Sequence, residues 1–273
     1  MTTHKTTTDE VPAGGKRLRV GALSFINALP FFYPFLQAGP PCEEDITYGT
    51  PTHINALLEA DALDVGLISS ANFLAHRDRY ILLTNLGIGA TKRVMSVCLY
   101  TRTPVHELSG KTIGISSASA TSAMLLKVLC RHFWKVSPQF IETQATSIEH
   151  VAACFDSFLL IGDECLTHPV LDGFEVIDMA EAWYRYTEKP FVFAVFATRC
   201  DAWVELPEKV RAFHRKLDAA WECSLHDSGM LLEEARRRTK LPLEHLRSYY
   251  DQLDFQLNPS HFQGMEHFAR LQQ

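Results

Sequence analysis

Small polar side chains recur in this sequence directly after short apolar runs, where the strands of an α/β protein would end. Each carries a hydroxyl, an amide or a carboxyl group: Ser24, Asn27, Thr50, Ser69, Ser70, Ser96, Ser119, Thr121, Ser122 and Asp163. Ligands of open α/β sheets bind beyond the carboxyl ends of the strands, where hydroxyls, backbone N–H groups and helix dipoles favour carboxylates and phosphates. The pattern predicts a cleft for a small organic anion, with the turn 24–27 at its edge.

The run from Ser116 to Ser122 is the strongest anion-binding candidate among these turns. It follows an apolar run and leads into an apolar helical period. Helix capping alone would account for Ser119, Thr121 and Ser122, although seven nearly consecutive small residues exceed what one cap needs. The chain contains no Gly-x-Gly-x-x-Gly or Walker-type glycine run, which argues against a nucleotide ligand.

Asn27 and Asp163 each allow more than one interpretation from their spacing. The Asn27 amide follows the first apolar run, where it would either bind a substrate carboxylate or hydroxyl or stabilise the turn. Asp163 follows Gly162, where it would accept a hydrogen bond from a substrate hydroxyl, act as a base, or serve as an ordinary Asx-turn residue. Spacing alone leaves both residues open.

Other site chemistries find little support in the sequence. The twelve histidines form no His-Glu-x-x-His motif or comparable group, so we predict no metal site. A serine nucleophile would need a Gly-x-Ser-x-Gly turn, and the chain has none. The basic run Arg236–Arg238 lies beside Glu233 and Glu234 at helical spacing, which favours a paired, solvated face over a nucleic-acid patch.

Length and composition are those of an ordinary globular protein. The chain has 273 residues, of which 47% are hydrophobic and 21% charged, and its mean hydropathy is -0.04. Two lobes of ordinary size are the better expectation for this length. A net charge of -6 provides no global field to attract nucleic acid or an anionic membrane, so we expect neither as a partner.

The N-terminal residues and the cysteines bear on location. Residues 1–17 are polar and Thr-rich and lack the apolar core of a secretory signal, so we expect a disordered tail. The most apolar stretch, 22–36, contains Asn27, Pro30 and Pro34 and is too short to cross a membrane. The seven cysteines form no Cys-x-x-Cys pair, which favours free thiols in a reducing cytoplasm.

The elements that must position the polar turns follow a βαβ pattern. Apolar runs predict strands at 18–23, 45–49, 64–68, 95–101, 111–116, 140–143, 157–162, 174–178 and 191–198. Helical periods follow several of these runs, and everything after 198 is expected to be helical. Thr50-Pro51 predicts an N-cap followed by Pro at the first helical position.

We therefore expect an α/β protein of two lobes. Residues 18–99 and 196–273 form the first lobe, and residues 100–195 form the second. The runs 95–101 and 191–198 carry the chain across and back, so that two crossing strands act as a hinge beside the cleft.

Six segments, taken together and in order, resemble one known family. They are RVGALSFINALP (19–30), VMS (94–96), SSASATS (116–122), LIGDECL (160–166), AWYRYTEKPFVFAVFAT (182–198) and YYDQLDFQLNP (249–259). On these segments the chain resembles the chorismate dehydratases of the futalosine route to menaquinone, over essentially its whole length from Leu18. The resemblance implies the periplasmic-binding-protein type II fold, with a cleft between its two lobes.

The resemblance also implies a reaction and roles for individual residues. The family dehydrates chorismate to 3-[(1-carboxyvinyl)oxy]benzoate without a metal or organic cofactor. Asn27 and Ser96 match its active-site Asn and Ser, and Thr121 and Ser122 match residues at a helix start that would hold a carboxylate. Ala120 stands where some relatives have Arg, which bears on how that carboxylate is recognised.

The general base and two other functions stay open. Asp163 is the only carboxylate in the matched turns, so the base is either Asp163 or the enolpyruvyl carboxylate of the substrate, positioned by Asn27 and Ser96. One alternative function is a non-catalytic cytosolic binding protein for a small carboxylate, which would not need the Asn27 turn together with 94–96. Another is the sister enzyme of the same pathway and fold, which acts on cyclic dehypoxanthine futalosine; a catalytic His would be expected there, and no matched turn holds one.

Overall fold

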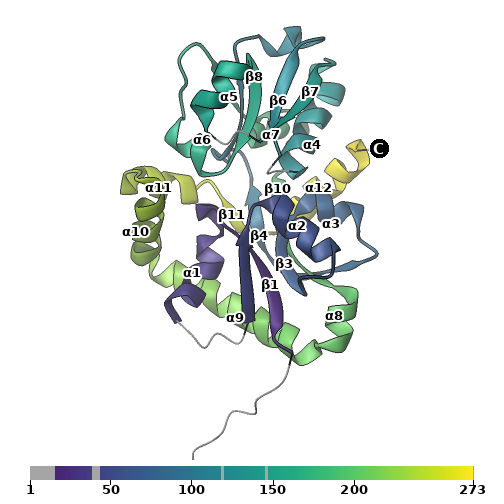
Figure 1. The fold of residues 1–273 in the computed structure, drawn as a ribbon, viewed down its shortest axis with the longest axis vertical. Helices are drawn as coiled ribbons and strands as arrows, with labels where there is room; N and C mark the ends of the chain where they lie inside the picture. The colour runs from purple at the N-terminus through teal and green to yellow at the C-terminus, as the bar shows by residue number, and fades with distance from the viewer. Residues whose placement is uncertain (1–15, 39–43, 118–119, 145–146, 273) are drawn as a thin grey trace, which may run out of the picture.

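The computed structural model of the chain describes residues 16–38, 44–117, 120–144 and 147–272. Within these ranges a six-stranded sheet has the order β11-β4-β10-β3-β1-β2. Its strands are β1 (Leu18–Leu23), β2 (Glu44–Gly49), β3 (Val65–Ser69), β4 (Tyr80–Ala90), β10 (Phe191–Arg199) and β11 (Asp254–Gln256). β1, β2 and β3 run parallel, and β10 is antiparallel to β3 and β4. Figure 1 shows this sheet in the lower part of the molecule.

A five-stranded sheet with the order β7-β6-β8-β5-β9 lies above it (Figure 1). Its strands are β5 (Val97–Thr101), β6 (Thr112–Ser116), β7 (Gln139–Thr143), β8 (Ser157–Ile161) and β9 (Glu175–Asp178). The two-lobed α/β architecture expected from the sequence is thereby confirmed. We call the part built on the six-stranded sheet lobe one and the part built on the five-stranded sheet lobe two.

The chain passes between the lobes twice. It leaves β4 at Ala90 and enters β5 at Val97, so residues 91–96 form a crossing segment, and it returns between α7 and β10 at residues 188–190. The expected boundaries, 99/100 and 195/196, lie a few residues further along the chain than these changes of sheet. β5 already pairs with β8 from Val97, and β10 already pairs with β4 from Phe191.

Helices cover both sheets. Lobe one carries η1 (Ile26–Ala28), α1 (Leu29–Ala38), α2 (Pro51–Glu59), α3 (Ser70–Ala75), α8 (Cys200–Glu205), α9 (Pro207–His226), α10 (Ser228–Thr239), α11 (Leu243–Tyr250) and α12 (Pro259–Leu271). Lobe two carries η2 (Val105–Glu107), α4 (Ala120–Val128), η3 (Leu129–Trp134), α5 (Ile148–Cys154), α6 (Asp163–Thr167) and α7 (Met179–Thr187). α12 contacts β10 and α3 as well as α4 of the other lobe. No helix in the described ranges is long and apolar enough to cross a membrane.

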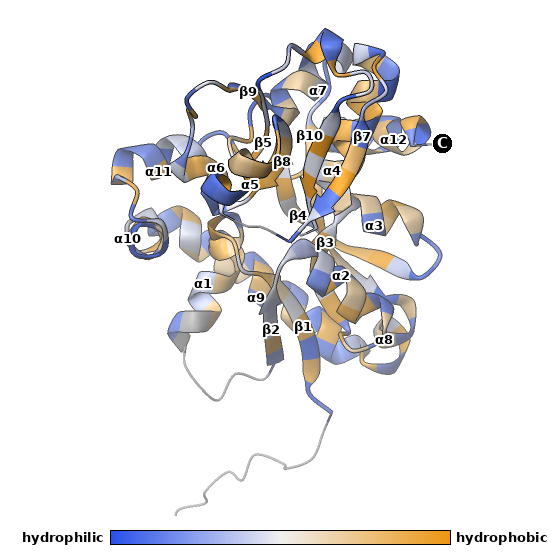
Figure 2. Ribbon diagram, turned by 45° about the horizontal axis from the view of Figure 1, so that its top comes forward, coloured by the Kyte–Doolittle hydropathy of each residue, from blue (hydrophilic) through white to orange (hydrophobic). Residues whose placement is uncertain are grey.

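The central strands of lobe one carry its core. Every residue of β3 and of β10 is buried, in contrast to the surface helix α10, which Figure 2 shows as mainly hydrophilic. Strands buried on both faces have nearly continuous apolar sequences rather than alternating ones, which is why 64–68 and 191–198 were recognisable. At the surface, Arg236, Arg237 and Arg238 pair with Glu233 and Glu234, as their spacing predicted.

Two strands were missed from the sequence. The segment YILLTNLGIGA forms β4, the longest strand of lobe one. It was not predicted because its Asn and Gly residues have low strand propensity. A Cβ at Gly87 would lie 2.6 Å from the Ala194 carbonyl oxygen of the neighbouring strand, so this residue is Gly because the backbones approach closely. The prediction that everything after 198 is helical is wrong for β11, which extends the sheet by pairing with β4.

Candidate active site

A small cavity lies where the two lobes meet. Its walls come from the β1–η1 turn, the N-terminal ends of α2 and α3, β4, the crossing segment and β10, and from α4 and the end of β8 in lobe two. The lining residues are Leu23, Phe25, Asn27, Pro51, Ser69, Ile88, Val94, Ser96, Val97, Thr121, Ser122, Ile161, Gly162, Phe193 and Ala194. Its volume is about 40 Å³, room for roughly three water molecules. The lobes must therefore separate or side chains shift before a larger molecule binds.

Asn27 places an amide group in this cavity. It lies in η1, directly beyond the carboxyl end of β1. The Asn27 Oδ1 atom is buried and has no hydrogen-bond partner in the described part of the protein. Leaving a buried acceptor unsatisfied costs about 1–3 kcal/mol, so this oxygen is suited to accept a hydrogen bond from a bound molecule.

Ser96 faces the cavity from a tightly held turn. Its backbone N–H donates to the Val94 carbonyl at 2.7 Å, and Met95 between them has a φ of 59°, a conformation that non-glycine residues adopt rarely. The buried Asp178 carboxylate accepts from the Val94 N–H at 3.0 Å and from the Met95 N–H at 2.7 Å. The same carboxylate caps α7 through Ala180. The turn that presents Ser96 is thus fixed by a residue of lobe two.

Asp178 was not singled out in the sequence as part of the site. Its place between an apolar strand and a helical period is typical of an N-cap, and that signal was available. Its hold on the crossing segment is a long-range contact that no local pattern reveals. Burial raises the pKa of the Asp178 carboxyl, and the hydrogen bonds it accepts from Met95, Glu181 and Val94 oppose that rise.

Three further hydroxyls line the cavity. Thr121 and Ser122 lie in the first turn of α4, each 2% exposed. The Thr121 Oγ1 accepts the Ala71 N–H of lobe one at 3.1 Å, so it also joins the two lobes. Ser69 caps α3 and receives the Asn55 amide at 2.8 Å. Five of the ten residues predicted from the sequence, Asn27, Ser69, Ser96, Thr121 and Ser122, are thus brought together.

Four other predicted residues, Ser24, Thr50, Ser70 and Asp163, lie outside the cavity wall. Ser70 is buried, but its hydroxyl donates to the Val192 carbonyl at 2.6 Å. Ser24 is exposed and its hydroxyl donates to the Gly49 carbonyl at 3.3 Å, while Thr50 caps α2 by accepting from the His53 N–H at 3.4 Å. Ser119 lies outside the described residues.

Asp163 joins the lobes behind the cavity. It begins α6 of lobe two, and its Oδ1 accepts the Ile26 N–H of lobe one at 3.2 Å. Burial raises the pKa of the Asp163 carboxyl to about 6, against the lowering effect of that hydrogen bond and of the Arg238 charge. The preceding Gly162 has a φ of 83°, and a Cβ there would collide with the Phe25 ring of the opposite lobe. The two lobes therefore meet closely at this turn.

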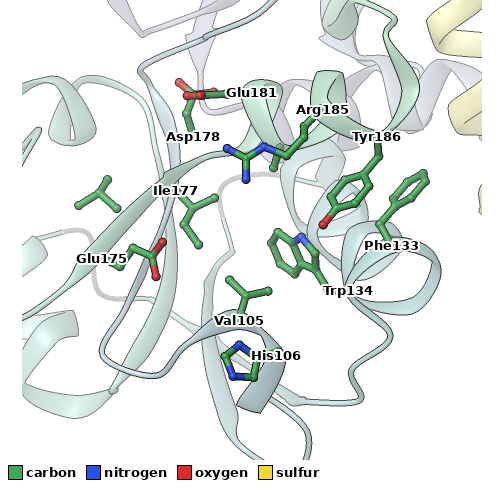
Figure 3. A pocket seen from close by; sticks show the side chains of 12 residues that line it. Val105, His106, Phe133, Trp134, Glu175, Ile177, Asp178, Glu181, Arg185 and Tyr186 are labelled. Carbon is green, nitrogen blue, oxygen red and sulfur yellow. The ribbon is translucent and has the colours of Figure 1, made fainter.

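A larger hollow, of about 410 Å³, lies on lobe two between η2, η3, β9 and α7. Figure 3 shows the Arg185 guanidinium near the rings of Trp134 and Tyr186, with Glu175 across the hollow. Of its charged side chains, Glu175, Glu181 and Arg185 are exposed to solvent and Asp178 is buried. The hollow shares no lining residue with the cavity. Among the residues that the structure describes, no three His, Cys, Asp or Glu side chains gather in a group able to bind a metal ion.

Sequence comparison relates the chain to one family. The profile of the family described as menaquinone biosynthesis matches residues 18–273. A chorismate dehydratase from Thermus thermophilus is 30% identical over 170 residues, which cover 56% of this chain and 61% of that protein. The match thus spans about three-fifths of the length of this curated relative.

Structural comparison identifies the fold. A protein from Archaeoglobus fulgidus superposes with a TM-score of 0.74 at 16% identity, covering 93% of this chain and 96% of its own. The alkanesulfonate-binding protein of Xanthomonas axonopodis pv. citri, bound to MOPS, gives 0.65 at 16% identity, with 96% of each chain covered. The periplasmic aliphatic sulphonate binding protein of Escherichia coli gives 0.62 at 15% identity, with 94% and 92% covered. The predicted periplasmic-binding-protein-like fold is therefore confirmed.

Proposed function

Because the chain belongs to the menaquinone biosynthesis family, we propose that it is a hydro-lyase that converts chorismate to the enolpyruvyl ether of 3-hydroxybenzoate. One observation in the structure supports this most: a buried amide oxygen without a partner, Asn27 Oδ1, faces hydroxyls of both lobes in one cavity. Chorismate has a hydroxyl to donate and two carboxylates to accept, which complements that set of groups. We also propose that the protein works in the cytoplasm with chorismate as its small-molecule partner.

The reaction requires orientation more than strong acids or bases. A base takes the proton from the ring carbon that bears the enolpyruvyl ether, and the electrons of that C–H bond spread through the diene towards the ring carboxylate. The C–O bond to the neighbouring hydroxyl then breaks, the departing oxygen receives the proton that the base took and leaves as water, and the ring becomes aromatic. No electrons are gained or lost overall, so no redox cofactor is needed. Aromatisation supplies driving force, and the protein supplies alignment and hydrogen bonds to developing charge.

Each polar group of the cavity has a role in this proposal. Asn27 Oδ1 accepts a hydrogen bond from the hydroxyl that leaves and so fixes its direction. The Thr121 hydroxyl, whose oxygen already accepts from Ala71, has its hydrogen available for a substrate carboxylate. Ser122, in the same helical turn, and Ser96, on the crossing segment, provide further hydroxyls. Ala120 provides no charge beside this turn, so hydroxyl groups and backbone carry the carboxylate recognition here.

We propose that the enolpyruvyl carboxylate of the substrate is the base. Asp163 is the alternative, and its pKa of about 6 would suit a proton acceptor. However, Asp163 is absent from the cavity wall, and its Oδ1 is engaged with the Ile26 N–H of the opposite lobe. The Asp163→Asn variant keeps an acceptor for that N–H and removes the basic oxygen. Retention of most of the turnover in Asp163→Asn supports a substrate base, whereas an inactive variant that still binds chorismate identifies Asp163 as the base.

The function itself is tested by incubating the purified protein with chorismate. We expect an aromatic product that is lighter than chorismate by one water, detected by absorbance and mass spectrometry. A folded protein that binds chorismate and returns it unchanged is a binding protein of the same fold, and that result contradicts the proposal. Conversion of cyclic dehypoxanthine futalosine in place of chorismate identifies the sister enzyme instead.

A further inference from the structure

Helix α11 presents two neighbouring tyrosines to the back of the cavity, and the proposed reaction gives neither of them a role. Both belong to the segment 249–259, one of the six on which the family resemblance rests. Tyr250 donates to the Ile26 carbonyl at 2.8 Å, beside Asn27. Tyr249, only 1% exposed, places its hydroxyl 3.0 Å from the Ser96 Oγ. A helix near the C-terminus thus reaches both the turn that carries Asn27 and the turn that carries Ser96.

The Tyr249 hydroxyl is a hydrogen-bond donor in this site. Burial raises the pKa of the Tyr249 phenol, and its hydrogen bond with Ser96 opposes that rise only in part. The phenol therefore stays protonated at neutral pH and keeps a hydrogen to donate. Its hydrogen bond is with Ser96, one of the residues proposed to act directly on the substrate.

The hydroxyl hydrogen of Ser96 makes only a weak hydrogen bond in this structure, so it can turn to another acceptor. A serine hydroxyl donates one hydrogen and accepts up to two. The Ser96 oxygen accepts from Tyr249, and its hydrogen points to the Val94 carbonyl at 3.3 Å. That carbonyl already receives the Ser96 backbone N–H at 2.7 Å, so the hydroxyl bond is the longer and weaker of the two. A carboxylate in the cavity would be the better acceptor, because hydrogen bonds to charged groups are the stronger ones.

We infer that Tyr249 is a positioning residue that acts through Ser96: it donates to the Ser96 oxygen while Ser96 turns its hydrogen to a substrate carboxylate. Hydrogen bonds in such a chain polarise and strengthen one another. The hydroxyl therefore holds the carboxylate more firmly and in one direction. This inference rests on the proposed function for the identity of the anion, but the link between Tyr249 and Ser96 can be tested without turnover.

The kinetic test replaces Tyr249 with Phe, which retains the ring in its packing site. We expect kcat of Tyr249→Phe to fall roughly tenfold and KM to change by less than about threefold, because lost orientation acts mainly on the chemical step. Tyr80→Phe is the matched control: Tyr80 is also buried, and its hydroxyl has no hydrogen-bond partner in the described residues. Wild-type kcat in a folded Tyr249→Phe protein overturns the inference.

A double-mutant cycle separates action through Ser96 from general support of the fold. If Tyr249 acts through Ser96, Ser96→Ala/Tyr249→Phe has the same kcat as Ser96→Ala within about twofold. Two independent contributions would instead multiply. A double variant roughly ten times slower than Ser96→Ala therefore overturns the inference.

The same four proteins are unfolded in urea without ligand. We expect the losses in unfolding free energy from the two single variants to be non-additive, because both variants remove the same hydrogen bond. If the wild-type protein does not convert chorismate, the proposed function fails on its own and the unfolding cycle still decides whether Tyr249 holds Ser96. Additive losses in that cycle overturn the inference whatever the substrate is.

Discussion

The hollow on lobe two is larger than the cavity between the lobes, but the cavity holds the groups better suited to bind a ligand. The hollow measures about 410 Å³ and the cavity about 40 Å³. Yet Arg185 and Glu175 in the hollow are exposed to solvent, and the buried Asp178 carboxylate beside them already accepts hydrogen bonds from backbone N–H groups. The cavity instead gathers buried hydroxyls and the Asn27 amide oxygen, which has no partner in the described part of the chain. Buried polar groups are normally hydrogen-bonded, so an unsatisfied one marks the site better than volume does.

The two regions also differ in how they are assembled. Residues 105–186 of lobe two supply every wall of the hollow. The cavity draws its walls from both lobes and from segments far apart in the sequence, and Asp178, Asp163 and Tyr249 hold those segments from behind. The full set of cavity groups comes together only when the lobes are closed. The volume measured in this closed state is therefore smaller than the space open to a ligand when the lobes separate.

Asn27→Ala should have the largest effect on activity. We expect kcat/KM for chorismate to fall roughly 100-fold or more, since removing one aligned group of an active site costs about that much. The measurement is a steady-state assay with Asn85→Ala, an exposed asparagine on β4, as the matched control. A loss below about fivefold in a folded Asn27→Ala protein would show that this cavity is not the active site.

Asp178→Ala should be the most destabilising change. It removes the cap of α7 and leaves the Val94 and Met95 N–H groups without an acceptor, which together cost about 3 kcal/mol of unfolding free energy. Urea unfolding measures this loss, and activity should fall with it because Ser96 is no longer held. Capping alone predicts about 1 kcal/mol, so a loss of that size would show that Asp178 does not hold the crossing segment.

Asp163 should make stability depend on pH in a defined window. Its pKa is about 6 in the folded protein against 3.8 for the free side chain. Between about pH 4 and 6 the folded state therefore retains a proton that the unfolded chain releases. This contribution is fully present below about pH 4 and is lost as the pH rises through about 6, by up to roughly 3 kcal/mol.

Comparison of wild type with Asp163→Asn across that range isolates the effect. As the pH rises, the wild type should lose unfolding free energy relative to Asp163→Asn. Above about pH 7 the difference between the two proteins should be constant. A difference that does not change with pH would mean that Asp163 is not buried between the lobes in solution.

Arg185→Ala, in the hollow, should have the smallest effect of the series. We expect kcat/KM to stay within about twofold of the wild type, because Arg185 is exposed and lies outside the cavity. The steady-state assay used for Asn27→Ala measures this directly. A loss above about tenfold would mean that the larger hollow participates in the reaction and is the better candidate for the active site.

Local sequence patterns and the family resemblance together were enough to locate most strands and five of the polar residues that line the cavity. Continuous apolar runs revealed the buried strands, and the rule that ligands bind after strand ends selected Asn27 and Thr121. Ser96 lies before β5 instead, and the family resemblance of 94–96 pointed to it. The same rule could not separate Ser69 from Ser70, because neighbouring residues share a turn but direct their hydroxyls to different places. Which of the two reaches the cavity depends on side-chain direction, which a pattern does not contain.

The residues that hold the site from behind were beyond sequence reasoning. Tyr249 lies 153 residues from Ser96, and Asp178 lies 83 residues from Met95. Neither pair has a local signature, since an aromatic residue in a helix normally predicts packing and an Asp before a helix normally predicts a cap. Strand β4 was missed for a related reason: its glycines fit because neighbouring backbones come close, and that closeness is a property of the assembled sheet.

A crystal structure of Ser96→Ala with chorismate tests the central claim most directly, because the variant should slow turnover while leaving the cavity open to substrate. We predict chorismate between the lobes, with its hydroxyl at Asn27 Oδ1 and a carboxylate at the first turn of α4. Chorismate bound instead in the hollow beside Trp134 and Arg185, or an empty cavity at saturating chorismate, would contradict the account.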